Sequence, residues 1–208
     1  MIQIHPEHTS ELDPVERILN EPVSASRLNL FHSCRLKFYY RYVLRLQKPV
    51  GAALHVGKVV HAALQDWSKR RWLGRAAVTA EIKEAFEHHW LGDNPAEAVL
   101  FEEGEEALEK AKAWSVVEMY LRDTPIPHAE KPEGVEVEVE ADLSSHGLPK
   151  LRGFIDLVRP VGRIVDFKTS ATSPNEEMVQ HRNELQLTVY GLLYREATLT
   201  RESGFELH

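Results

Sequence analysis

The 208 residues carry a formal net charge of -7, with 43% hydrophobic and 27% charged residues. This balance is typical of a globular chain and excludes a wholly disordered or fibrous one, and the length favours one elaborated domain over residues 1–208. Phosphate binding depends on Lys and Arg, so in an acidic chain any nucleic-acid surface must be local.

The sequence also bears on cellular location. No apolar run approaches the ~18 residues needed to cross a bilayer, and the N-terminus is too acidic and interrupted for a secretory signal. Cys34, the single cysteine, cannot form an internal disulfide, which fits a reducing compartment. We therefore expect a cytoplasmic protein with no membrane partner.

The first half of the chain predicts helices. Residues 1–23 predict a loosely ordered leader with one short helical turn, and a helical period then runs from a possible cap at Ser24 to about Leu46. An apolar stripe predicts a second helix over residues 53–73, ended by Gly74. Residues 76–123 hold two more helical patterns, separated by the breaker "GDNP", and we expect them to form a helical insertion.

The second half begins with a period of two. "GVEVEVEADL" alternates valine with glutamate and predicts a strand with one wet or functional face. Strands over residues 150–158 and 163–168 follow, joined around "RPVG", and then a helix over about 175–197. "GFELH" resembles the start of another strand, and the chain stops there, which leaves open a shortened C-terminus.

Two carboxylates fall on the predicted hairpin. Asp156 lies opposite residue 165 or 166, and cross-strand Cβ atoms are ~5 Å apart, close enough for one Mg²⁺ or Mn²⁺ to bridge Asp156 and Asp166. Lys168 shares a strand face with Asp166 because side chains alternate. The alternative is a surface ion pair between Asp156 and Lys168. The apolar residues around the charges argue against it, because an unpaired charge on a central strand is costly.

Five segments in this order resemble the RecB-like branch of the PD-(D/E)XK nucleases: "SASRLNLFHSCRLKFYYRY", "HVGKVVHAAL", "LRGFIDLV", "IVDFKTS" and "ELQLTVYGLLY". The resemblance implies an α/β fold with a restriction-endonuclease-like core, in which helices flank a mixed central sheet. It implies a metal site of His61, Asp156, Asp166 and the backbone carbonyl of Phe167, with Lys168 as the catalytic lysine. It also assigns Gln186 and Tyr190 to a helix motif beside the site.

Each residue taken from the family has an ordinary alternative. A helical histidine such as His61 is more often structural or solvent-facing. Gln186 and Tyr190 share a helix face with Arg182, which could orient Lys168 or the DNA backbone or be a polar edge. For an acidic position that the family often has on the strand before Asp156 we choose Glu138, although a register slip would select Glu136 or Glu140.

Cys34 marks a departure from some relatives. Iron-sulfur members of this branch, including CRISPR-associated nucleases, have the first of four cluster cysteines at this place. The sequence contains no other cysteine, so no iron-sulfur cluster is expected from this chain as written. Cys34 is then predicted to be a small buried residue.

A basic and aromatic stretch offers a local DNA surface. Residues 34–48 interleave aromatic residues with cations that include Arg35, Lys37 and Arg41, a pattern that suits phosphates and unpaired bases. The alternative is an amphipathic helix with its aromatic residues buried. "SKRRWLGR" is a second candidate patch, and the acidic run "FEEGEEALEK" is interpreted as a solvated helix face.

The predicted function is divalent-metal-dependent hydrolysis of phosphodiester bonds in DNA, single-stranded or at duplex ends. The family implies exonuclease action. Two alternatives stay open: a DNA-binding module that does not cleave, or a nuclease subunit docked on a helicase or another component of a DNA repair or CRISPR-adaptation assembly. No G-x-x-x-x-G-K-[ST] phosphate loop is present, so the sequence does not indicate a P-loop motor.

Overall fold

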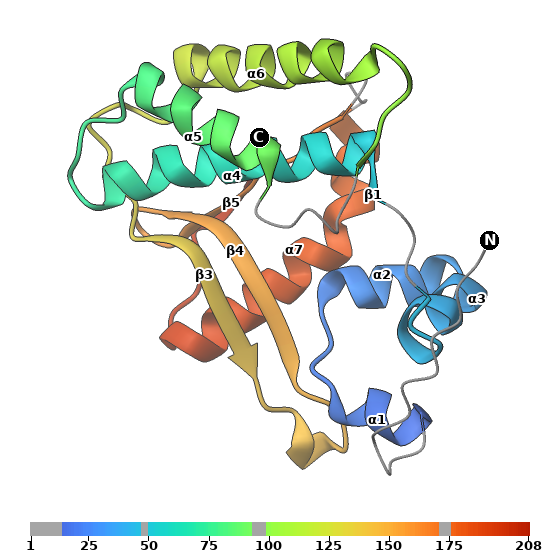
Figure 1. Ribbon diagram of the computed structural model, residues 1–208. Helices are drawn as coiled ribbons and strands as arrows, with labels where there is room; N and C mark the ends of the chain where they lie inside the picture. Colours follow the sequence, from blue (N-terminus) through green and yellow to red (C-terminus); the bar gives the residue numbers. More distant parts are fainter. Residues whose placement is uncertain (1–13, 47–49, 93–98, 171–175) are drawn as a thin grey trace. The chain divides into compact units, whose positions relative to one another are not determined.

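The computed structural model describes residues 14–46, 50–92, 99–170 and 176–208 (Figure 1), with side chains except at residues 14, 15, 19, 100 and 176–182. The chain divides into two compact units. The first comprises Met1–Lys48, Glu138–Phe154 and Asn175–Arg201. The second comprises Pro49–Val137, Ile155–Pro174 and Glu202–His208.

The larger sheet is mixed. Its strands, in spatial order, are β3 (Gly134–Ala141), β4 (Leu151–Arg159), β5 (Arg163–Asp166) and β6 (Gly204–Leu207). β4 and β5 are antiparallel, whereas β6 is parallel to β5. The predicted strand at "GFELH" is therefore confirmed. With helices flanking this sheet, the predicted α/β class is confirmed and is consistent with a restriction-endonuclease-like core.

Three helices build the core of the second unit: α4 (Ala52–Trp72), α5 (Thr79–Leu91) and α6 (Glu105–Asp123). They pack side by side (Figure 1). Their buried apolar residues form one cluster with the sheet, made of Val59, Val60, Ala63, Leu64, Trp67, Ile82, Phe86, Trp90, Ala113, Val117, Leu121, Ile126, Leu157, Val165 and Phe167. This cluster fixes α4 against β4 and β5.

The region predicted as a helical insertion contributes to that core. Its acidic run is exposed or half-buried, as expected for a solvated face, but Ala113, Val117 and Leu121 follow on α6 and are buried. A two-stranded parallel sheet of β1 (Val50–Gly51) and β2 (Val99–Leu100) also forms here, which the sequence did not predict. α5 and α6 thus belong to the hydrophobic core of this unit.

The helical structure predicted from Ser24 to about Leu46 is confirmed over residues 25–43, but it is divided and does not form one continuous helix. The structure has α2 (Ala25–Ser33), α3 (Arg35–Phe38) and a π-helix, η1 (Tyr39–Val43). Cys34 is extended between α2 and α3, and its thiol caps α3 by accepting from the Lys37 N–H at 3.5 Å. It is half-buried instead of buried.

Ring packing explains this break. Phe31 and Phe38 are seven residues apart and would be ~10 Å apart along one continuous helix. Their ring centroids are 5.1 Å apart because the chain turns at Cys34. The Ser24 cap is confirmed, since its side chain accepts from the Arg27 N–H at 3.3 Å.

The remaining elements of the first unit are α1 (Pro14–Asn20), the 3-10 turn η2 (Ser144–His146) and α7 (Glu176–Thr198). α7 packs on the start of β4 at Gly153, where an added Cβ would lie 2.9 Å from Leu193 and 3.2 Å from Tyr190. Glycine is needed here for this close approach. No helix in the described part of the chain is both long and apolar enough to cross a membrane.

Candidate functional site

The β4–β5 hairpin brings two carboxylates face to face. Leu157 pairs with Val165, so the register, continued by one step, places Asp156 opposite Asp166. This decides between the two registers left open by the sequence. The connecting turn has positive φ at Val161 and Gly162, and the Glu133 carboxylate supports it by accepting both backbone N–H groups. Glu133 lies outside the hairpin, so a residue of another segment stabilises the strained turn and the register that the turn sets.

Each carboxylate has a defined partner. Asp156 Oδ2 accepts a 2.7 Å hydrogen bond from the Phe167 N–H, and Asp166 Oδ2 lies 2.5 Å from Lys168 Nζ. β6 holds this end of the strand: the Lys168 N–H donates to the His208 carbonyl, and the His208 N–H donates to the Asp166 carbonyl. The predicted shared face of Asp166 and Lys168 is confirmed.

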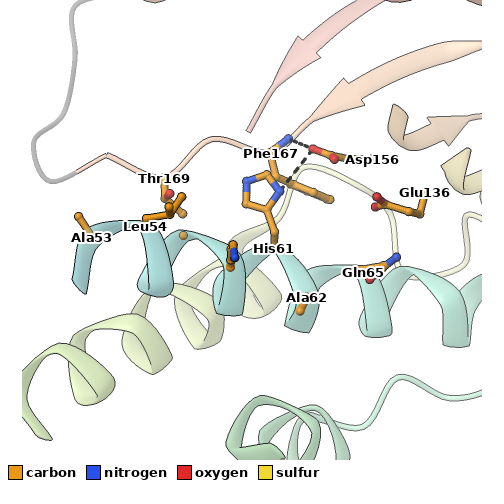
Figure 2. A pocket seen from close by; sticks show the side chains of 11 residues that line it. Ala53, Leu54, His61, Ala62, Gln65, Glu136, Asp156, Phe167 and Thr169 are labelled. Atoms are coloured by element: carbon orange, nitrogen blue, oxygen red, sulfur yellow. Dashed lines mark hydrogen bonds and ion pairs between the residues drawn. The ribbon is translucent and has the colours of Figure 1, made fainter. Parts of the chain in front are cut away.

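His61 approaches the hairpin from α4. Its Nδ1 lies 3.7 Å from Asp156 Oδ2, and its ring packs edge-on to Phe167 with centroids 6.2 Å apart. Figure 2 shows the imidazole pointing from the helix toward Asp156 and Phe167. The neighbouring residues Val59 and Val60 are buried in the core, which sets the rotation of the helix and presents His61 to the hairpin.

The electrostatics of this group are unfavourable for bare carboxylates. Burial, followed by the neighbouring Asp166 carboxylate, raises the pKa of Asp156 to about 7. Burial also raises the pKa of Asp166, against the opposing effect of the Lys168 ammonium. Burial and the Lys168 charge together lower the pKa of His61, which favours its neutral form. The site would therefore be stabilised by added positive charge.

His61, Asp156 and Phe167 border a cavity of about 510 Å³. One face of α4 lines it at helical spacing with Leu54, Lys58, His61 and Gln65, and Glu136 and Asp156 lie across from this face (Figure 2). A Cβ on Gly57 would lie 3.2 Å from Thr169 Oγ1, so glycine lets the segment after Lys168 approach the helix. Lys58 and Gln65 were missed as site residues. Their spacing of three and four from His61 was the available signal.

Glu136, not the predicted Glu138, is the glutamate of β3 that lines this cavity. Glu136 has φ of 50°, and a Cβ on Gly134 would lie only 2.5 Å from Val137 Cγ2. A regular strand separates such residues by ~10 Å, so the backbone is bulged at Glu136 and the side chain is redirected. Glu136 is solvent-accessible within the cavity, yet partial burial raises its pKa.

The other predicted site residues lie in the first unit. Glu138 is exposed and forms a 3.3 Å ion pair with Arg152. Gln186 Nε2 donates to Tyr190 Oη at 2.8 Å, so these two residues do share a face of α7. The side chain of Arg182 lies outside the described residues.

The two candidate basic patches differ. Arg35, Lys37 and Arg41 are exposed in the first unit. In the "SKRRWLGR" patch, Arg71 is buried, donates to the carbonyls of Pro127 and Glu130 and lies over Trp67. Arg70 is paired with Glu81. The "SKRRWLGR" segment is therefore wrong as a patch in which every cation is available to bind phosphate, because Arg70 and Arg71 are engaged within the protein.

The donor chemistry fits a hard divalent cation. Among the described residues, no three His, Cys, Asp or Glu side chains already converge as a metal cluster. The Asp166 carboxylate is turned to Lys168, and that of Asp156 to the Phe167 N–H. Two opposed carboxylates with raised pKa values, one of them beside a neutral imidazole at the edge of the cavity, are nevertheless suitable ligands for Mg²⁺ or Mn²⁺.

A sequence model of the PD-(D/E)XK nuclease superfamily matches residues 22–206. The chain belongs to this superfamily. No curated protein matches its sequence. Membership in the PD-(D/E)XK superfamily suggests a metal-dependent nuclease with DNA as its substrate, and such nucleases typically use Mg²⁺ or Mn²⁺.

Proposed function

We propose that this PD-(D/E)XK protein is a divalent-metal-dependent deoxyribonuclease of the RecB-like branch that acts as an exonuclease. The observation that carries the proposal is the opposition of Asp156 and Asp166, with Lys168 paired to Asp166 and with His61 beside Asp156 at the edge of a cavity. His61, Asp156, Asp166 and the Phe167 carbonyl would hold the cation. Bound there, it would lower the pKa of water and polarise the scissile phosphate.

The protein groups supply positioning and charge. The Phe167 N–H holds the Asp156 carboxylate in a fixed orientation through its 2.7 Å hydrogen bond. Lys168 can turn its ammonium from Asp166 toward the phosphate or the attacking water, where it stabilises the developing negative charge. The lowered pKa of His61 keeps the imidazole neutral and able to donate its lone pair.

Glu136 replaces Glu138 as the proposed acidic residue of β3, because it lines the same cavity as Asp156. Gln186 and Tyr190 stay proposed as a positioning pair, supported by their mutual hydrogen bond. Association with a helicase or another repair or CRISPR-adaptation protein also stays a proposal. The exposed acidic run before and within α6 supports it as a docking surface.

A nuclease assay on end-labelled DNA tests the activity. Linear single strands, duplexes and circular single strands are incubated with Mg²⁺ or Mn²⁺. Wild type should degrade linear substrates and spare circles. Lys168→Ala and Asp166→Ala should each lose at least about 100-fold in rate, the usual effect of removing one group that stabilises a charged transition state.

Lys112→Ala is the matched control, because this lysine is exposed on α6 and forms a local i, i+3 ion pair with Glu109. Its activity should equal that of wild type. Cleavage that survives both site substitutions would refute the assignment. If wild type binds DNA without cleaving it, the result would favour a DNA-binding module that does not cleave. Cleavage of circular single strands would refute the proposed exonuclease action.

A further inference from the structure

The segment from Ser24 to Lys48 is basic in an otherwise acidic chain. It contains no Asp or Glu, whereas the whole chain has a net charge of -7. Two of its arginines are structural, since Arg27 is buried beside Glu21 and Arg45 pairs with Glu21 at 2.6 Å. Among the residues of this segment that the structure describes, the cations Arg35, Lys37 and Arg41 are exposed. With the described residues, none of the three forms an ion pair with a carboxylate.

Aromatic rings are exposed on the same elements. Tyr39 is 46% exposed, Tyr40 is 45% exposed and Phe31 is 41% exposed. The sequence left open a helix with its aromatic residues buried, and the structure does not show that arrangement. The rings of Tyr39 and Tyr40 have centroids 6.0 Å apart and open η1, a π-helix. π-Helical turns are rare and frequently mark functional sites.

Neighbouring aromatic rings lie beside two of these cations. The Arg35 guanidinium lies 5.5 Å from the Phe31 ring, and that of Arg41 lies 5.7 Å from Tyr42. Phe38 packs between Phe31 and Tyr42, with centroids 5.1 Å from each. Arg35 and Arg41 are therefore held near aromatic faces, which reduces the conformational entropy that they lose when they bind a ligand.

We propose that α2, α3 and η1 form a second binding surface, for single-stranded DNA, in which Tyr39 and Tyr40 stack on unpaired bases and Arg35, Lys37 and Arg41 neutralise phosphates. A basic surface without carboxylates complements a phosphate backbone. Exposed rings require bases that are not already stacked in a duplex. The choice of DNA over RNA rests on the proposed function.

Binding without cleavage tests this surface. Fluorescence anisotropy of a labelled oligothymidylate is measured with the full chain in a chelator, so that no metal-dependent cleavage occurs. Tyr39→Ala and Tyr40→Ala should each weaken binding about 10-fold, the effect of losing one stacked base. Tyr39→Phe should bind like wild type, because it keeps the ring. Trp72→Ala is the matched control, an exposed aromatic residue on α4.

An abasic oligonucleotide of equal length distinguishes stacking on bases from contacts with phosphates. The tyrosine substitutions should leave its binding unchanged, whereas Arg35→Gln, Lys37→Gln and Arg41→Gln should weaken both oligonucleotides. Each of these three should also reduce the slope of log affinity against log salt by about 0.7. Lys112→Gln is the charge control. Folding of every variant is checked by circular dichroism.

Unchanged affinity in the tyrosine variants, or equal loss on the abasic strand, would overturn the proposal. So would tighter binding of a blunt duplex or of oligouridylate than of oligothymidylate. These failures are distinct from a failure of the nuclease. If binding depends on the tyrosines but the protein never cleaves DNA, only the proposed nuclease activity is refuted. If the protein cleaves DNA but binding does not depend on the tyrosines, only the proposed binding surface is refuted.

Discussion

At the scale of single residues, the facing carboxylates are an unfavourable feature of the metal-free protein. Asp156 and Asp166 are opposed on a buried hairpin, and burial raises the pKa of each. The Lys168 ammonium offsets part of that cost at Asp166. An arrangement that destabilises the protein without a cation is best explained by a site that binds one, because such strain persists mainly where function needs it.

Asp156 should make the stability of the metal-free protein depend on pH. Its folded-state pKa of about 7 lies above the unfolded value of 3.8, so the native state binds more protons between these values. The contribution of this group is therefore most favourable below pH 4 and falls as the pH rises to 7. Asp156→Asn should be more stable than wild type by roughly 2 to 4 kcal/mol at pH 8 and about equal to it at pH 4. Urea unfolding in chelator measures this, and a difference independent of pH would contradict it.

The two glutamates of β3 form a matched pair. Glu136→Gln removes a carboxylate from the cavity and should lower cleavage about 10- to 100-fold, as loss of a supporting residue at a metal site typically does. Glu138→Gln removes a carboxylate that pairs with Arg152, and it should change the cleavage rate less than about twofold. Rates at saturating Mn²⁺ decide between them. The reverse order would restore Glu138 as the acidic residue of the site.

At the scale of elements, the site depends on how α4 is held. α4 presents His61 because its opposite face is packed into a core shared with α5 and α6. The helices predicted as an insertion are therefore required for the geometry of the site. Phe86 of α5 is fully buried and contacts the rings of Trp90 and Trp114.

Phe86→Ala should lower the free energy of unfolding by about 3 to 5 kcal/mol, because it leaves a cavity where a large ring was packed. Leu108→Ala is the control on α6, where the side chain is 57% exposed, and should stay within about 0.5 kcal/mol. Chemical denaturation provides both values. If Phe86→Ala cost no more than Leu108→Ala, the two helices would be dispensable for the core.

At the scale of the whole molecule, cation binding and folding should be linked. A ligand that binds only the native state stabilises it, by about 2.7 kcal/mol at 100 times its dissociation constant. Mn²⁺ or Mg²⁺ should therefore raise the melting temperature at pH 8. The rise should shrink at pH 5, where protons compete for Asp156.

Asp166→Asn should abolish this rise. Asp142→Asn, at an exposed carboxylate that caps Ser144, should retain it. Differential scanning fluorimetry with and without chelator provides the comparison. An equal rise in both variants would place the cation elsewhere on the protein.

The amino-acid sequence by itself determined the helix predicted over residues 53–73, the β4–β5 hairpin and the shared face of Asp166 and Lys168, and the family resemblance implied the α/β class. The helix, the hairpin and the shared face follow from local periodicity and turn residues, which act over a few positions. Tertiary structure alone decided that Asp156 faces Asp166, that His61 reaches them from α4, and that Glu136 turns into the cavity. Strand register, helix rotation and a bulge at a non-glycine residue depend on packing between distant segments, and a pattern of apolar and polar residues does not encode those contacts.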